Sequence, residues 1–149
     1  MSLPNGRAGA HNSQGNLIAL DEWRHAMAKV KQLTVALENR PGTLAHMAKV
    51  LADAKVNIVA LLNSTAGAQG SAQVVVDSVN RAKKALGAAG LPYTEGTLEQ
   101  VELANKPGAL AELAGKLAKK GTNIECAYAT MPKGAKKAVV VLALSGPTL

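Results

Sequence analysis

Apolar and polar positions follow two different periods along this chain, and the two periods succeed each other in a regular order. Between Leu33 and Leu37 every second residue is apolar, which is the period of a strand with one buried face. From Leu44 onward the apolar residues recur every three or four positions, which is the period of a helix with one buried face. The pattern therefore predicts a strand through residues 33–37 and a helix through about 44–54.

The same reasoning predicts the other elements of a first unit. Further strands are expected at 56–62, 71–79 and 91–95, a loop rich in Gly and Ala at 63–70, and a second helix at 81–89. Strand, helix, two strands, helix and strand is the order of a split βαβ unit. We expect an α+β, ferredoxin-like fold with antiparallel sheets and helices on one face.

A second series of elements follows, and it is shorter. This series repeats the first half of the unit, without its last helix and strand. It consists of strands at 98–103, 123–130 and 138–144, a helix through Leu110 and Leu117, and a loop at 131–137. Upstream, Asp21 and the spacing of the apolar residues after it predict a short amphipathic helix through about Val30. We expect this helix to take the place of the elements that the second unit lacks. The expected division is residues 1–30 as leader and helix, 31–96 as first repeat and 97–149 as second.

The repeat is visible in the residues themselves. The segment Asn39-Arg40-Pro41-Gly42 returns as Asn105-Lys106-Pro107-Gly108, and Val56-Asn57-Ile58 returns as Thr122-Asn123-Ile124, each 66 residues later (39 to 105 and 57 to 123). A period held over this length indicates two copies of one supersecondary unit.

Two strands lack alternation altogether. Residues 74–76 and 138–144 are continuously apolar, which is typical of strands covered on both faces. Because helices can cover only one face, this pattern favours a second chain on the other, and we expect a homodimer.

Composition narrows the class of protein. Of the 149 residues 48% are hydrophobic, no apolar run approaches a membrane span, and a single Cys excludes an internal disulfide framework, so we expect a cytoplasmic protein. The histidines, the cysteine and the acidic residues show no spacing of a metal site or of an acid–base pair. We expect no catalytic residues, no metal and no cofactor: the chain is predicted not to be an enzyme.

The net charge of +7 and the pI near 9.7 raise the alternative of nucleic-acid binding. RNA-binding domains with this order of elements stack bases on aromatic residues of the sheet. Here aromatic residues make up 2% of the chain, and the strands 33–37 and 71–79 contain none. Without stacking platforms the charge alone gives only weak, salt-sensitive binding, so nucleic acid is an unlikely partner.

Each Asn-x-Pro-Gly turn lies where a helix is predicted to begin. Pro suits the first helical position, Gly allows close approach to the backbone, and the free N–H groups of a helix start attract a carboxylate. The Asn side chains have two possible roles, capping the helix or contacting the ammonium of a ligand. Residue types alone favour capping.

These residues resemble the ACT domain, a small βαββαβ module that binds amino acids and regulates amino-acid metabolism. The resemblance rests on the (Asp/Asn)-x-Pro-Gly-x-Leu turn and the x-Asn-Ile strand start, both present twice between Lys31 and Leu144. It implies a ligand site at the interface between ACT units. The implied ligand-binding residues are Asn39, Arg40, Pro41, Gly42, Thr43, Leu44, Asn57, Ile58, Asn105, Lys106, Pro107, Gly108, Ala109, Leu110, Asn123 and Ile124.

The expected function is that of a non-catalytic regulatory protein. Binding of an amino acid or similar small effector between ACT units is expected to alter the activity of a partner enzyme or regulator. The alternative is an oligomerisation or protein-interaction module that binds no ligand. Thr43 carries a hydroxyl that Ala109 lacks, so the two sites are not expected to be equal.

Overall fold

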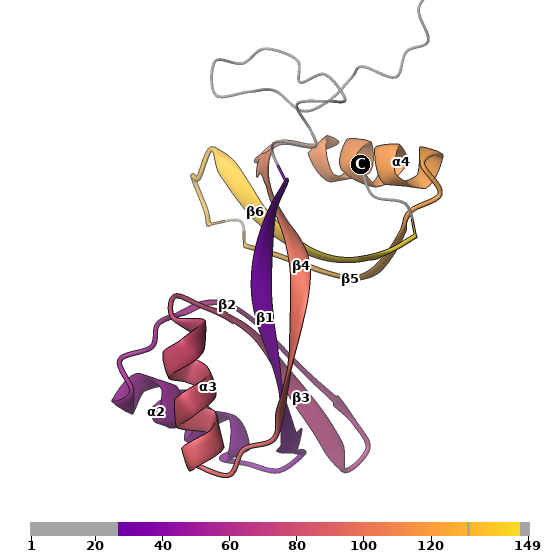
Figure 1. Ribbon diagram of the computed structural model, residues 1–149. Helices are drawn as coiled ribbons and strands as arrows, with labels where there is room; N and C mark the ends of the chain where they lie inside the picture. The colour runs from indigo at the N-terminus through magenta and orange to yellow at the C-terminus, as the bar shows by residue number, and fades with distance from the viewer. Residues whose placement is uncertain (1–26, 131, 147–149) are drawn as a thin grey trace, which may run out of the picture. The chain divides into compact units, whose positions relative to one another are not determined.

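The computed structural model describes residues 27–130 and 132–146, and within them the fold is α+β. The elements of this part of the chain are β1 (Met27–Glu38), α2 (Thr43–Asp53), β2 (Ile58–Ala66), β3 (Gln69–Val76), α3 (Val79–Ala88), β4 (Tyr93–Ala104), α4 (Ala109–Lys119), β5 (Asn123–Thr130) and β6 (Lys137–Ser145) (Figure 1). The residues divide into two compact units. The first unit is Val30–Thr97, and the described part of the second is 27–29 with 98–146.

The first unit has the predicted βαββαβ order. Its strands lie in the order β2-β3-β1-β4, and α2 and α3 cover one face of this sheet (Figure 1). The apolar residues of the two helices, of β1 and β3, and of the connection before β2 form one buried cluster: Leu33, Val35, Leu37, Met47, Leu51, Val56, Ala72, Val74, Val76, Ala82 and Leu86. The alternation in β1 and the helical spacing in α2 are thus both explained by burial against a common core.

The hairpin of β2 and β3 is tighter than predicted. Ser64 pairs with Ser71 and Ala66 with Gln69, so most of the segment expected to be a loop at 63–70 is strand. Only two residues connect the strands, and Gly67 has a φ of 63° that a tight turn requires. The prediction of a long loop was wrong because the small residues that suggested it are tolerated in these paired strands.

The second unit is built from the end of β4, α4, β5 and β6. Its core gathers the apolar faces of α4 and of two strands: Val101, Leu103, Ala109, Leu113, Leu117, Val140 and Leu142. The strand order on this side is β1-β4-β6-β5, so the first residues of β1 take the position of a fourth strand.

These first residues of β1 correct the prediction of a helix through residue 30. Met27–Val30 is strand, and the remainder of the predicted helix, 21–26, lies outside the described residues. Met27 packs on the core of the second unit, and the Lys29 ammonium pairs with the carboxylate of Glu99 on β4. Helical spacing was misleading here because this segment is held by a distant strand, not by its own turns.

No linker separates the two units. The boundaries at Val30 and Thr97 fall inside β1 and β4, whereas the sequence-based boundaries, 31 and 96, were placed between elements. Val75 and Val141 of the continuously apolar strands are only 4% and 2% exposed within this single chain. Burial within one chain thus accounts for these apolar positions, and the homodimer stays a prediction.

Candidate functional site

The turn between β1 and α2 is shaped by a glycine at the helix N-cap. Gly42 occupies that position with φ 92° and ψ −13°, in the left-handed region that favours Gly, and Thr43 is the first helical residue. Gly108 has nearly the same geometry before α4, with φ 91° and ψ −17°. Pro41 and Pro107 therefore precede the cap, and the prediction of Pro at the first helical position was wrong.

The Asn side chains that begin the turns do not cap the helices. The Asn39 amide Nδ2 donates to the Gly67 carbonyl at 2.7 Å, and Asn105 Nδ2 donates to the Ala135 carbonyl at 2.8 Å. Each Asn backbone N–H donates to the same connection between strands, to Ala68 and Lys136 respectively. The two asparagines thus tie each turn to the neighbouring strand connection and hold it in place.

The start of α2 leaves backbone donors open. The N–H of His46 donates to the Gly42 carbonyl at 2.9 Å, and this is the first bond of the helix. The N–H groups of Thr43, Leu44 and Ala45 make no hydrogen bond within the described residues, and they point out of the end of the helix that carries partial positive charge. At α4 one of the corresponding groups is engaged, because Ala109 N–H donates to the Lys106 carbonyl at 3.4 Å.

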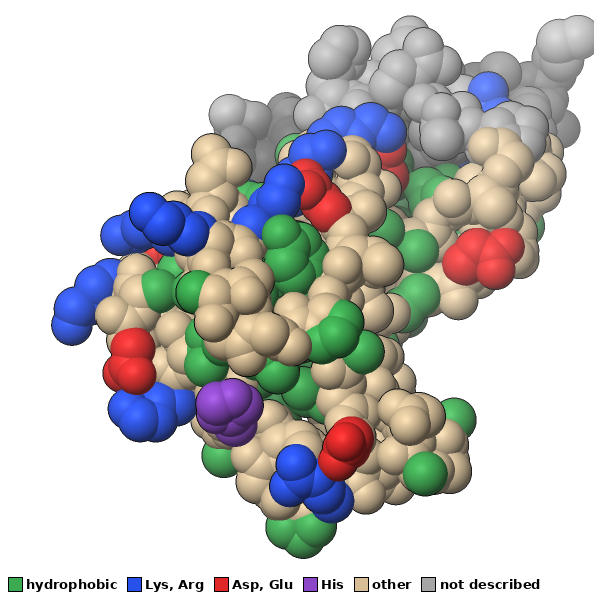
Figure 2. Space-filling view, turned by 60° about the horizontal axis from the view of Figure 1, so that its bottom comes forward, with side chains coloured by type: hydrophobic (Ala, Val, Ile, Leu, Met, Phe, Trp, Pro, Cys, Tyr) green, Lys and Arg blue, Asp and Glu red, His purple; other side chains and the backbone are tan. Residues whose placement is uncertain are grey.

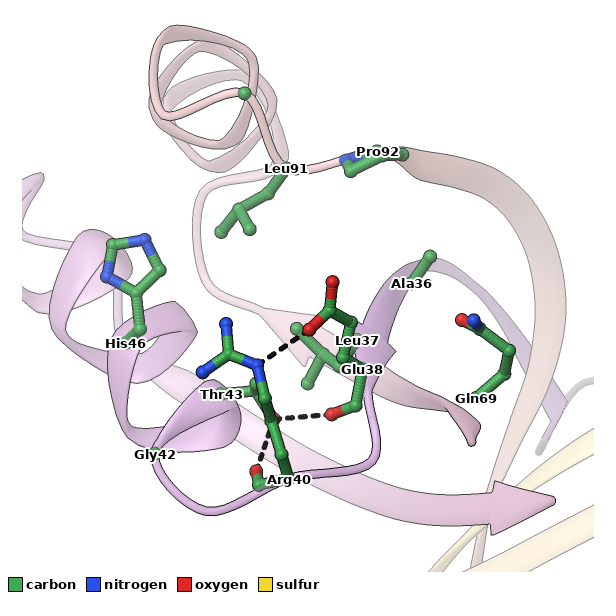
Figure 3. Close-up of a pocket in the computed structure, with 11 residues that line it drawn as sticks. Ala36, Leu37, Glu38, Arg40, Gly42, Thr43, His46, Gln69, Leu91 and Pro92 are labelled. Atoms are coloured by element: carbon green, nitrogen blue, oxygen red, sulfur yellow. Dashed lines mark hydrogen bonds and ion pairs between the residues drawn. The ribbon is translucent and has the colours of Figure 1, made fainter. Parts of the chain in front are cut away.

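Two hollows flank the first turn. The larger, about 540 Å³, lies between the turn, the ends of β1 and β3 and the connection from α3 to β4, and Figure 3 shows its lining: Ala36, Leu37, Glu38, Arg40, Gly42, Thr43, His46, Gln69, Gly90, Leu91 and Pro92. In Figure 2 this face is hollowed beside the purple side chain of His46. The smaller hollow, about 240 Å³, lies between the turn and β2, and its lining includes Asn63, Thr65 and Gly70.

An acidic and a basic side chain lie together in the larger hollow. Arg40 Nε contacts Glu38 Oε2 at 2.6 Å, and both side chains are 66% exposed. The Thr43 hydroxyl lies 2.8 Å from the carbonyl of Glu38 and 3.2 Å from that of Arg40, which fixes the backbone between them. Figure 3 shows the Glu38 carboxylate and the outer end of the Arg40 guanidinium directed into the hollow.

The x-Asn-Ile residues lie far from the turn of their own unit. Ile58 pairs with Val76 at one end of the β2–β3 hairpin, and Ala66 pairs with Gln69 at the other, near the turn. Ile58 and Ala66 are eight residue steps apart along β2 (66 − 58), which is roughly 25 Å. The Asn57 backbone N–H donates to the Asp77 carboxylate at 2.9 Å.

In the second unit the residue equivalent to Asn57 is Asn123, and its side chain binds an acidic side chain. Asn123 Nδ2 donates to Glu125 Oε1 at 2.9 Å, and the Ser145 hydroxyl donates to the same oxygen at 2.6 Å. These bonds, chiefly the one from Ser145, lower the pKa of Glu125 from its ordinary value. Within each unit the structure therefore brings together the residues of the turn, Asn39 to Leu44 and Asn105 to Leu110, but not the Asn-Ile pairs.

Several residues of the first site were not found from the sequence. His46, Gln69 and Leu91 line the larger hollow, and Asn63 and Thr65 line the smaller one. For the strand residues the necessary signal is the register of β3, in which Gly70 pairs with Leu37 of β1 and with Thr65 of β2. His46 could have been found, because it lies one helical turn after Gly42 and so shares the mouth of α2.

Within the described ranges, no group of three or more His, Cys, Asp or Glu side chains is placed to hold a metal ion. In that same part of the chain, no helix has the length and apolar character needed to span a membrane.

Comparison with known proteins identifies the family. A model for a pair of ACT domains matches residues 28–144. The chain belongs to this family. The match spans both units, so the resemblance seen in the Asn-x-Pro-Gly turns and the ferredoxin-like fold is confirmed.

Solved structures agree with this ACT domain pair. Protein BT0572 from Bacteroides thetaiotaomicron is 30% identical, with a TM-score of 0.76 over 81% of this chain and 83% of that one. The ligand-free regulatory subunit of aspartate kinase from Thermus thermophilus is 17% identical, with a TM-score of 0.60 over 78% and 85%. The same subunit from Thermus flavus is 18% identical, with a TM-score of 0.54 over 78% and 86%. The two aspartate kinase subunits show likeness of fold alone. No curated protein matches the chain.

Proposed function

We propose that this ACT domain pair is a non-catalytic regulatory protein that binds an amino acid or a similar small effector at its Asn-x-Pro-Gly turns. The observation that carries the proposal is the larger hollow of the first unit. It places the start of α2, where Gly42 and Thr43 line the hollow and the Thr43 N–H is open, beside one basic and one acidic side chain, Arg40 and Glu38.

The hollow suits the chemistry of an amino acid. A carboxylate is stabilised at a helix N-terminus by the open N–H groups and the partial positive charge. Gly42 exposes the backbone, since a Cβ placed there would meet no atom within 4 Å. Leu37 and Leu91 add apolar surface to the same hollow for the ligand's side chain. A volume of about 540 Å³ is ample for one amino acid.

Regulation follows if the effector favours one arrangement of the protein over another. An effector shifts such an equilibrium only by its difference in affinity for the two states. The regulatory subunits of aspartate kinase share this fold, which supports a role in which the chain acts on a partner enzyme or regulator. The location that we propose for this role is the cytoplasm. The Asn57-Ile58 and Asn123-Ile124 pairs remain proposed ligand contacts.

The second candidate function is an interaction module, and one feature of β2 favours it. This strand is the edge of the sheet of the first unit, and its sequence from Ile58 to Ala66 has no charged residue. Val59 and Leu61 are 55% and 44% exposed there. Proteins usually protect edge strands with charge, so this edge suits pairing with a second copy of the chain as a homodimer.

Thermal unfolding against a panel of the twenty amino acids, each at millimolar concentration, tests the proposal. An amino acid at 100 times its dissociation constant adds about 2.7 kcal/mol to the free energy of unfolding, which is a rise in Tm of about 5–11 °C for a protein of this size. We expect one or a few related amino acids to raise the Tm. A flat panel together with a stable dimer in sedimentation would instead favour the interaction module.

A further inference from the structure

We infer that the first ACT unit selects zwitterions, with Arg40 binding the carboxylate and Glu38 the ammonium of the same ligand, and that the second unit lacks this pair. The inference rests on the proposed function and makes it more specific. It names the charges that a ligand must carry and predicts one bound molecule per chain.

The geometry of the pair leaves both charges available. Arg40 uses Nε to contact Glu38 Oε2, and its two terminal nitrogens make no hydrogen bond within the described residues. Glu38 Oε1 likewise has no partner in that part of the chain. In Figure 3 the outer end of the guanidinium and the carboxylate both face the hollow. The existing contact thus orients the two groups and does not involve the atoms that would bind a ligand.

The spacing of the two charges suits one small molecule. An α-amino acid carries its carboxylate and its ammonium on a single carbon, so it needs an acid and a base side by side. Glu38 and Arg40 are two residues apart and in contact, and the Thr43 hydroxyl ties the backbone of both. A ligand with a carboxylate alone would leave Glu38 near its own negative charge, which is unfavourable.

The second unit differs at the decisive positions. At the repeat distance of 66 residues, Ala104 takes the place of Glu38 and Ala135 that of Gln69, while Lys106 replaces Arg40. The turn of this unit therefore keeps a cation but loses the adjacent acid.

The second unit also has an acidic residue at the start of its helix. Glu112 lies in the first turn of α4, whereas α2 has no acidic residue in its first turn. One carboxylate oxygen of Glu112 is buried without a hydrogen-bond partner. Its negative charge already complements the N-terminus of α4, so a second carboxylate there would be repelled.

Calorimetric titration of the full chain tests the inference with pairs of probes. The probes are the amino acid that raises the Tm and the 2-hydroxy acid of the same carbon skeleton, in which a neutral hydroxyl replaces the ammonium. We expect the wild-type chain to bind the amino acid with a stoichiometry of one and the hydroxy acid at least tenfold more weakly. Glu38→Gln should weaken binding of the amino acid about tenfold to a hundredfold and strengthen binding of the hydroxy acid, because the repulsion of its carboxylate is removed. Arg40→Gln should weaken binding of both.

Two variants outside the hollow serve as matched controls for the substitutions of Glu38 and Arg40. Glu102→Gln removes the carboxylate that pairs with Lys137 at 3.3 Å, and Lys49→Gln removes the ammonium that pairs with Asp53 on α2. Both are exposed ion pairs, and both variants should bind the two probes as the wild type does. Equal binding of the amino acid by Glu38→Gln and wild type would overturn the inference and leave the proposed function standing. Two molecules bound per chain would also overturn it, and binding of no amino acid would overturn both.

Discussion

Leu51→Ala is expected to lower the free energy of unfolding by about 2–5 kcal/mol. Leu51 lies on the buried face of α2 with no exposed surface, in the cluster that joins both helices of the first unit to its sheet. The substitution removes apolar contacts and leaves a cavity that the surrounding strands cannot fully close. Urea unfolding followed by circular dichroism measures the change.

The matched control for this prediction is Leu110→Ala. Leu110 lies on α4 and is 53% exposed, so the same chemical change there should alter the free energy of unfolding by less than about 1 kcal/mol. An equal loss in the two variants would contradict the assignment of the buried face of α2.

Gly42→Val should lower the free energy of unfolding by about 1–3 kcal/mol, although no atom obstructs the new side chain. Gly42 has a φ of 92°, and a Cβ there would meet nothing within 4 Å. The cost is therefore strain of the backbone, which is severe for a β-branched residue in the left-handed region. Thermal unfolding in the absence of amino acids measures it.

Two further substitutions separate strain from bulk. Gly42→Asn should cost less than Gly42→Val, because Asn adopts left-handed conformations more readily. Gly96→Val should cost little, since Gly96 lies in β4 without a positive φ and a Cβ there also meets open space. If Gly42→Val were as stable as Gly96→Val, the left-handed cap of α2 would be wrong.

Much of the fold follows from local patterns. The helix through Leu44 and Met47, the helix through Leu113 and Leu117 and most strands were predicted from periodicity, because each buries one face against its own unit. The start of β1 was not predicted. Met27 and Lys29 are held by contacts with a core and a strand about 70 residues away, and no local period reports such contacts.

The candidate site, like the fold, was predicted only in part from the sequence. The two turns were located from Asn-x-Pro-Gly, but the roles of their residues were not, because residue type does not fix the partner of a side chain. Asn39 has the chemistry of a helix cap, yet the hairpin from β2 to β3 places a carbonyl within its reach, and that bond forms instead. Gln69 and Asn63 enter the site through the same hairpin, whose register involves residues that the sequence pattern assigns to a loop.

The central claim is that an amino acid binds at the start of α2, and amide NMR tests it most directly. The chain of 15.3 kDa suits two-dimensional nitrogen–proton spectra during titration with the amino acid that raises the Tm. The account predicts that the amide signals of Thr43, Leu44 and Ala45 move together and saturate, since their N–H groups receive the carboxylate. Saturating shifts elsewhere, with these three signals unmoved, would contradict it.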